Sequence, residues 1–239
     1  MKDSDFYKLL RIMRNHPYLI KFQAENAYAE TLLNRGEIYM QSAQYYKELE
    51  MKTGMRGQGD IYENQFFNGF INIGMEFPIY CMYAVHNTQI ENQTIALDKQ
   101  VLDDFCTEEG YITLCKTNEF LRQFNQFCKN VDWCAGLVQY GHRTLEADLL
   151  SLSKGYTAHF FKKEDLSYQQ EFRIRINEPL ERIDLSDDEQ VIVKKNGEKY
   201  WRDHTFKTRV EIIHDISAFS TQYIINDLEF DGNTYFLKF

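Results

Sequence analysis

The residues of this chain that could do chemistry are concentrated in one short stretch, YQQEFRIRI at positions 168–176. Its alternation predicts a strand with one apolar face, and it places Glu171 beside Arg173 and Arg175 on the face away from the core. Flanking guanidinium groups keep a carboxylate ionised and aligned, so Glu171 could orient a sugar hydroxyl or activate a nucleophile. The alternative is a row of solvated or cross-strand ion pairs, which is the commoner role of charged residues on a half-buried strand.

A second candidate is the glycine-rich loop GMRGQGD at positions 54–60, which places the cation Arg56 among three glycines. The loop matches neither the Walker A pattern nor GxGxxG, so it indicates a flexible surface loop more strongly than a phosphate site. Asp60 and Glu63 follow it closely. Two carboxylates without a third ligand fall short of a divalent-cation site, so the sequence predicts no complete metal site.

The thiols offer a third kind of chemistry. Five cysteines form no CxxC pair and are odd in number, so they support neither a zinc ribbon nor a disulfide framework, and we expect reduced thiols. Cys81 and His86 lie five residues apart and would form a nucleophilic pair only if the fold brought them together. A buried core cysteine is the simpler interpretation of Cys81.

The composition bounds the class of protein. With 239 residues, of which 44% are hydrophobic and 15% aromatic, the chain can form one large domain with a sizeable aromatic core. A net charge of −9 and an isoelectric point near 5.2 argue against general nucleic-acid binding but leave room for a local basic cleft. No apolar leader or stretch of membrane-spanning length is evident, so we expect a cytoplasmic protein without a membrane segment.

Regular elements must position these side chains, and hydrophobic periodicity predicts most of them. In the first half we expect a helix over 3–15, a strand over 18–22 that contains Lys21, a helix over 25–35 with Gly36 at its C′ position, a strand over 37–41, and a helix capped by Ser42. The apolar run 68–86 predicts one or two buried strands at the centre of a sheet, interrupted at Pro78. In the middle of the chain we expect helices over 98–105 and 118–130 and strands over 110–116 and 133–140.

Beyond Pro179 the pattern is typical of β-hairpins. Asn196-Gly197 lies between alternating arms and predicts a two-residue type I′ turn, and LEFDGNTYFLKF ends the chain as a second hairpin. We therefore predict an α+β fold, a single domain with a mixed, mainly antiparallel sheet flanked by helices. Residues 1–179 would form its core and residues 180–239 a hairpin-rich C-terminal part of the same domain, with a small separate subdomain as the alternative.

Three segments together resemble a known group of bacterial proteins. They are IKFQAENAYAETLLNRGEIYMQSAQYYKELE, the glycine loop ending in GD and followed by YEN, and FFKKEDLSYQQEFRIRI. They look like the poorly characterised proteins grouped under the domain of unknown function DUF2971, which have a strand, a helix ending at a glycine-led strand, and a late Tyr-x-x-Glu-[Phe/Trp]-Arg motif. That layout is similar, more distantly, to the ADP-ribosyltransferase fold, in which an early strand supplies a residue for NAD and a late strand the catalytic glutamate.

The resemblance implies roles for particular residues. Lys21 would be the early residue that contacts NAD, Tyr39 or Tyr45 would stack on nicotinamide, and Glu171 would be the catalytic acid. With NAD as the cofactor, we expect Glu171 to orient the ribose and Arg56 and Arg173 to touch phosphate.

The leading functional hypothesis is therefore a nucleotide- or NAD-handling enzyme, an ADP-ribosyltransferase-like effector in phage defence or a toxin system. One alternative is a non-enzymatic defence or interaction protein that engages a protein partner instead of a nucleotide-like small molecule. A metal-dependent nuclease using Asp60, Glu63 and Glu171 is the other. An enzyme requires that Lys21, Arg56 and Glu171 converge on one pocket, whereas an interaction protein does not.

Overall fold

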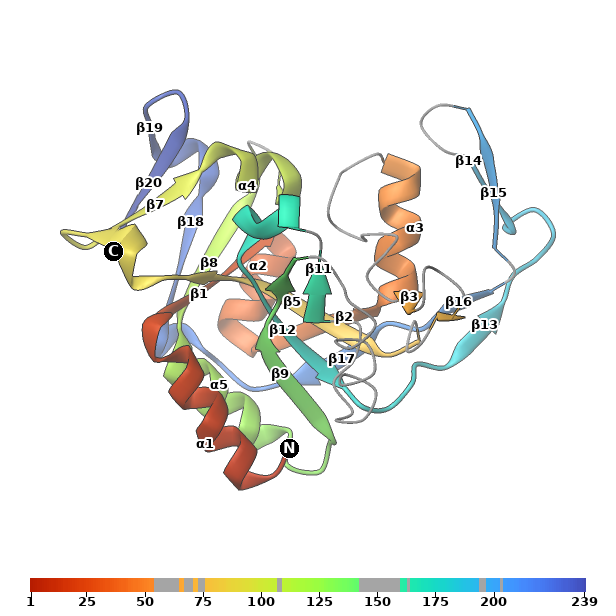
Figure 1. The fold of residues 1–239 in the computed structure, drawn as a ribbon, viewed down its shortest axis with the longest axis horizontal. Helices are drawn as coiled ribbons and strands as arrows, with labels where there is room; N and C mark the ends of the chain where they lie inside the picture. Colours follow the sequence, from red (N-terminus) through yellow and green to blue (C-terminus); the bar gives the residue numbers. More distant parts are fainter. Residues whose placement is uncertain are drawn as a thin grey trace.

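An eight-stranded sheet organises the fold (Figure 1). The structure is a computed structural model that describes residues 1–53, 65–66, 71–72, 76–106, 109–141, 160–162, 164–193, 197–202 and 204–239. Six strands follow in the order β17-β2-β5-β1-β8-β18, and β12 and β9 extend the sheet from the other edge of β5, every pair being antiparallel. Their bounds are β1 Tyr18–Gln23, β2 Glu37–Ser42, β5 Pro78–Val85, β8 Tyr111–Lys116, β9 Trp133–Leu137, β12 Glu171–Ile176, β17 Arg209–Ile212 and β18 Ser220–Ile224.

Helices and a second sheet cover this large sheet. The helices are α1 Asp3–Ile12, α2 Asn26–Arg35, α3 Ala43–Thr53, α4 Lys99–Phe105 and α5 Thr117–Phe127, with 3₁₀ turns at η1 Met13–Asn15, η2 Asn87–Gln89, η4 Glu164–Gln169, η5 Ser217–Phe219 and η6 Ile225–Asp227. The second sheet has the order β19-β20-β7-β6, with bounds β6 Ile90–Glu91, β7 Thr94–Asp98, β19 Glu229–Phe230 and β20 Thr234–Lys238. Short pairs complete the described strands: β3 Gln65–Phe66 with β4 Ile71–Asn72, β10 Gln139–Tyr140 with β11 Phe161–Lys162, β13 Arg182–Asp184 with β16 His204–Phe206, and β14 Val191–Val193 with β15 Lys199–Trp201.

Both faces of the large sheet are buried around its central strands β5 and β12. One core cluster joins side chains of α1, α2 and α5 to the inward residues of β12, including Phe172. The other joins α4 and the second sheet to residues such as Ile20 and Tyr83. Burial on both sides explains why β5 and β12 are buried along nearly their whole length. Among the described residues, no helix is long and apolar enough to cross a membrane.

The predicted α+β fold, a single domain with a mainly antiparallel sheet flanked by helices, is confirmed, although the large sheet is wholly antiparallel rather than mixed, and several local signals acted as expected. Gly36 ends α2 in a left-handed conformation with φ of +63°. The Ser42 hydroxyl accepts a hydrogen bond from the backbone N–H of Tyr45 at 3.1 Å, which caps the start of α3. Pro78 is the first residue of β5, a position where the missing N–H does no harm.

The strand expected over 168–176 is shorter than predicted, and its polar face is not exposed. Residues 164–169 form η4, and Gln170 turns the chain with φ of +39°, so β12 begins at Glu171. The side chains predicted to face away from the core are only 3%, 1% and 6% exposed at Glu171, Arg173 and Arg175. Alternation identified the two faces correctly, but it could not show that the second face is also covered.

The C-terminal residues pair with strands from the first half of the chain. β17 pairs with β2, β18 with β8, and β20 with β7. The β14–β15 hairpin is present, but its register joins Val193 to Lys199 and so leaves an odd number of residues between the arms. Residues 194–196 lie outside the described residues, so the predicted type I′ turn at Asn196-Gly197 stays a prediction. Gly197 itself has a φ of +84°, and the second central position of such a turn requires a positive φ.

A two-residue turn with positive φ does occur at a place the sequence analysis missed. Asn92 and Gln93 have φ of +48° and +61° and join β6 to β7, where Glu91 pairs with Thr94. This is the backbone geometry of a type I′ hairpin. The asparagine was the signal for it, because asparagine tolerates the left-handed region.

Gly36→Ala is expected to lower the free energy of unfolding by about 2–3 kcal/mol. A Cβ atom at Gly36 would lie 2.0 Å from the backbone oxygen of His214, which cannot swing aside as a side chain can. Gly197→Ala is the matched control, because Gly197 also has positive φ but nothing lies within 4 Å of its added Cβ. The control should lose about 1 kcal/mol from backbone strain alone. Equal losses in chemical denaturation would show that the His214 contact is unimportant.

Candidate functional site

A cavity of about 190 Å³ lies where the large sheet forks. On the edge of β5 opposite β12, β1 pairs only as far as Tyr83 and β2 only as far as Ile79, so both strands leave the middle of β5. An apolar cavity of about 150 Å³ in a protein can hold benzene, so this one has room for one six-membered ring with a small substituent. Its lining comes from β1, α3, β5, α4, η4 and β12: Ile20, Lys21, Phe22, Tyr46, Cys81, Met82, Tyr83, Phe105, Gln169 and Glu171.

Glu171 brings an anion to this cavity, and two cations fix it there. Arg173 donates a hydrogen bond from Nε to its Oε2 at 2.7 Å and places Nη2 2.6 Å from the same oxygen, and Lys162 donates to Oε1. The side chains of Glu171, Arg173 and Lys162 are 4%, 1% and 0% exposed. Burial by itself raises the pKa of the Glu171 carboxyl, but Arg173 and Lys162 outweigh it, so the pKa is lowered. Glu171 is therefore an ionised carboxylate held in one orientation.

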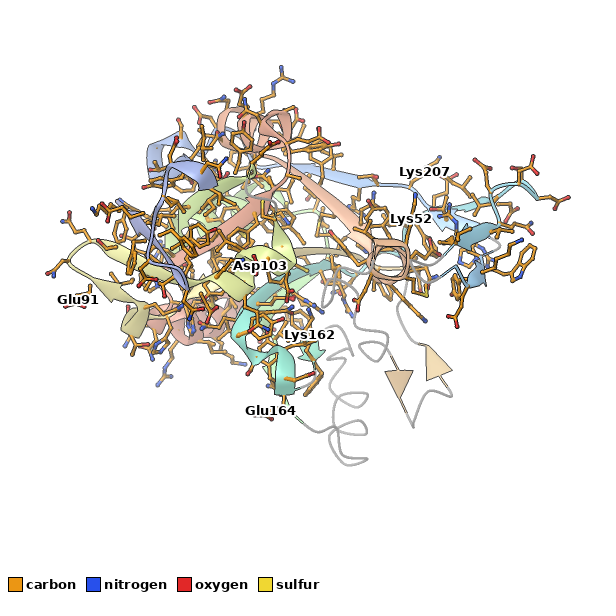
Figure 2. All side chains as sticks on the ribbon, turned by 90° about the horizontal axis from the view of Figure 1, so that it is seen from above. Lys52, Glu91, Asp103, Lys162, Glu164 and Lys207 are labelled. Atoms are coloured by element: carbon orange, nitrogen blue, oxygen red, sulfur yellow. The ribbon has the colours of Figure 1, made fainter. Side chains whose placement is uncertain are left out.

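Further hydrogen bonds hold Lys162 and the backbone of Glu171 in place. Lys162, on β11, donates a second hydrogen bond to Gln169 Oε1 at 2.8 Å, and its buried position contrasts with that of Glu164, which is exposed (Figure 2). The backbone N–H of Glu171 donates to the Tyr140 hydroxyl at 2.9 Å. The carboxylate is thus fixed by its side-chain partners and by its own backbone.

Lys21 contributes a cation from the opposite side of the fork. Its ammonium donates to the backbone oxygen of Cys81 at 3.0 Å and lies 4.5 Å from the centre of the Tyr80 ring. The carbonyl is free to accept this bond because β1 has already left β5 at that point. Among the described residues, the Cys81 oxygen is the hydrogen-bond acceptor of the Lys21 ammonium. An ammonium has three N–H groups, so two of those of Lys21 remain for a ligand. Burial lowers the pKa of Lys21.

Aromatic rings form the apolar walls. Phe22 and Phe105 stack with an interplanar angle of 3° and centroids 6.0 Å apart, and Phe22 meets Tyr83 edge to face at 6.2 Å. Tyr46 also lines the cavity, and burial raises the pKa of its phenol, which therefore stays protonated. A flat ring could enter among these side chains and find the charges of Lys21 and Glu171 beside it.

The tyrosines selected from the resemblance lie elsewhere. Tyr45 is 39% exposed, and Tyr39 is 36% exposed and donates to Glu37 at 2.6 Å. Neither is among the described residues that line the cavity, whereas Tyr46 is. Helical periodicity does not distinguish them, because Leu49 is three residues from Tyr46 and four from Tyr45 and so neighbours both on the helix surface.

The other predicted site residues have mixed outcomes. Lys21 and Glu171 do meet at one cavity, but Arg173 supports Glu171 and does not line that cavity. Arg56, Asp60 and Glu63 lie outside the described residues. Sequence reasoning missed several residues of the site: Phe22, Tyr46, Phe105, Lys162 and Gln169. Phe22 and Phe105 have the sequence pattern of ordinary core residues, and nothing in the sequence marks Lys162 as a buried lysine.

Arg175 has a different partner from the one its position suggested. It donates from Nε to Asn177 Oδ1 at 2.9 Å and lies over the Phe77 ring, 5.0 Å from its centre. Of Arg173 and Arg175, therefore, it is Arg173 whose guanidinium contacts Glu171. The charged face of β12 divides into a Glu171–Arg173 pair and a separate Arg175–Asn177 pair.

The thiol interpretations can also be compared with the structure. Cys81 lines the cavity, but His86 contacts the Thr88 hydroxyl at 2.8 Å and the His16 ring at 5.1 Å, so the two do not form a nucleophilic pair. Burial raises the pKa of the Cys81 thiol to about 11, which keeps it protonated at neutral pH. Over the described ranges, no group of three His, Cys, Asp or Glu side chains is placed to hold a metal ion.

Comparisons of the chain with protein-family models, curated proteins and solved structures found no match. The function of the cavity must therefore be inferred from its own geometry.

Proposed function

We propose that the cavity binds the nicotinamide end of NAD and that the protein cleaves the bond between nicotinamide and ribose, passing the ADP-ribosyl group to water or another acceptor. The observation that carries this proposal is the position of Glu171, an ionised and fully buried carboxylate that lines a cavity of about the size of one ring. A carboxylate used only for structure has no need to reach a cavity.

The chemistry explains why such a carboxylate would be useful. When the glycosidic bond breaks, its electron pair leaves with nicotinamide and positive charge develops on the ribose. An oriented anion beside the sugar stabilises that charge and can accept a hydrogen bond from a ribose hydroxyl. Arg173 and Lys162 already hold Glu171 in place, so little reorganisation is needed when the charge forms. A nucleophile then bonds to the ribose carbon and gives up its proton.

The other lining groups fit the rest of this substrate. Phe22, Tyr46 and Phe105 offer rings to the nicotinamide, and the unused N–H groups of Lys21 can donate to an oxygen of NAD. The cavity is too small for the whole dinucleotide, so the adenosine half would lie outside it. A phosphate contact from Arg56 remains a prediction.

Glu171→Asp is the variant that tests the proposal. Aspartate keeps the charge that Lys162 and Arg173 require but withdraws the carboxylate by one methylene. A displacement of that order lowers turnover by about a hundredfold in a preorganised site. The measurement is nicotinamide released from NAD by the purified protein, with circular dichroism to confirm folding.

Glu164→Asp is the matched control, since Glu164 is exposed and lies outside the cavity lining. It should release nicotinamide at the rate of the parent. If the parent releases no nicotinamide above the buffer rate, or if Glu171→Asp is as active as the parent, the proposal is wrong.

A further inference from the structure

A second cavity, of about 490 Å³, lies at the opposite end of β1 from the first. Tyr18 lines this cavity and Phe22 lines the other one, so the two sites are separated along the strand. Its walls are α1, η1 and the junction of β8 with α5, and α1 and α5 lie side by side (Figure 1). The lining residues are Tyr7, Leu10, Arg11, Met13, Arg14, His16, Pro17, Tyr18, Lys116, Thr117, Asn118, Glu119 and Arg122.

Four cations gather in this cleft on a protein whose net charge is −9. Arg11, Arg14, Lys116 and Arg122 are all exposed, and none of them has an ion-pair partner in the described ranges. Some exposed cations elsewhere are paired, as Lys207 is with a glutamate at 2.6 Å, and others such as Lys2 and Lys129 have no such partner among the described residues, but these do not line the cleft. Unpaired cations that share one concavity create a local positive potential and attract anions.

The cleft is held in a fixed shape. The Thr117 hydroxyl donates to the His16 backbone oxygen at 2.7 Å, and the Thr117 backbone N–H donates to the Pro17 oxygen at 2.9 Å. Tyr18 pairs directly with Lys116 where β1 and β8 meet. These bonds tie the end of η1 to the start of α5, so the cations stand on a rigid frame rather than on a loop.

We propose that this cleft binds a nucleoside di- or triphosphate. Four cations against the single carboxylate of Glu119 leave three positive charges, which match the charge of such a phosphate chain. Arginine presents a planar fork of donors that fits phosphate oxygens. Tyr7 is 69% exposed and offers a ring on which a base can stack. The proposal does not depend on the NAD cavity.

Calorimetric titration of the full chain with ATP, inorganic tripolyphosphate and adenosine tests this site. ATP should bind most tightly and adenosine most weakly, and the affinity for ATP should fall as salt is raised. The double variant Arg14→Gln, Arg122→Gln should bind ATP about tenfold or more weakly, because each charge-assisted bond contributes strongly. It should keep the NAD turnover of the parent, since neither residue lines the first cavity.

The double variant Lys2→Gln, Lys129→Gln is the matched control, because it removes the same charge from two exposed residues outside the cleft. It should bind ATP within about twofold of the parent, since distant surface charges are screened. Adenosine binding as tight as that of ATP, or equal losses in the two double variants, would overturn the proposal. A single-stranded oligonucleotide that binds far more tightly than ATP would also overturn it, because the ligand would then be a nucleic acid.

Discussion

Glu171→Gln is expected to lower the free energy of unfolding by about 3–5 kcal/mol. Glutamine keeps the size of the side chain, but it removes the anion that Lys162 and Arg173 both contact. Those two cations are 0% and 1% exposed, so water cannot take over the role of the carboxylate. Removal of one member of a buried ion cluster costs more than the pair contributed, because the remaining charges stay buried without compensation.

Two further variants separate charge from shape. Glu171→Asp keeps the anion and should lose much less stability than Glu171→Gln. The triple substitution Lys162→Met, Glu171→Met, Arg173→Met removes all three charges together, and it should be more stable than Glu171→Gln, since buried ion clusters can often be replaced by apolar side chains at little cost. Urea denaturation gives the three values. A Glu171→Gln protein as stable as the parent would show that Lys162 and Arg173 do not depend on the carboxylate.

Glu171→Gln should also change how the free energy of unfolding depends on pH. The pKa of Glu171 is lowered in the folded protein from its ordinary value of 4.5, so the folded state binds fewer protons than the unfolded state in this range. Its contribution is therefore complete above about pH 5 and declines as the pH falls through 4.5 towards the folded pKa. Glu171→Gln lacks this titration, so its unfolding free energy should change less between about pH 5 and pH 3.

Local patterns predicted the elements well and the environment of their polar faces poorly. The helix ended by Gly36 and the helix capped by Ser42 depend on signals within a few residues, and both were found. The parity of β12 was also correct, with Phe172 on one side and Glu171 on the other. The second face is covered partly by β11 and η4, which directly precede β12, and partly by residues of β1, α3 and α4, which lie far from β12 in sequence.

The candidate site shows the same division. Glu171 was recognisable from its flanking arginines, whereas Lys21 was selected only through the resemblance to the ADP-ribosyltransferase layout. Lys162 could not be found in this way, because a KK pair in a short polar segment ordinarily lies in water. The choice between Tyr45 and Tyr46 was not within reach either, because Leu49 neighbours both of them on the helix surface.

Phe172→Ala is expected to destabilise the protein by about 3–5 kcal/mol while leaving the chemistry of the cavity intact. The Phe172 ring is 0% exposed and belongs to the core cluster that includes Phe124 and Trp133. Removing it leaves a void that close-packed neighbours can fill only in part. The ring points to the face of β12 opposite Glu171, so the carboxylate and its two cations should keep their geometry.

This combination distinguishes a stability residue from a catalytic one. Urea denaturation followed by tryptophan fluorescence measures the loss, and nicotinamide release per folded molecule measures the chemistry. Phe127→Ala is the control, because its ring is 42% exposed and should cost about 1 kcal/mol or less. Phe172→Ala should unfold more easily yet match the parent in turnover per folded molecule, whereas Glu171→Asp should show the reverse. A folded Phe172→Ala protein that loses turnover as Glu171→Asp does would mean that the two faces of β12 are coupled, because the core ring would then help to position the carboxylate.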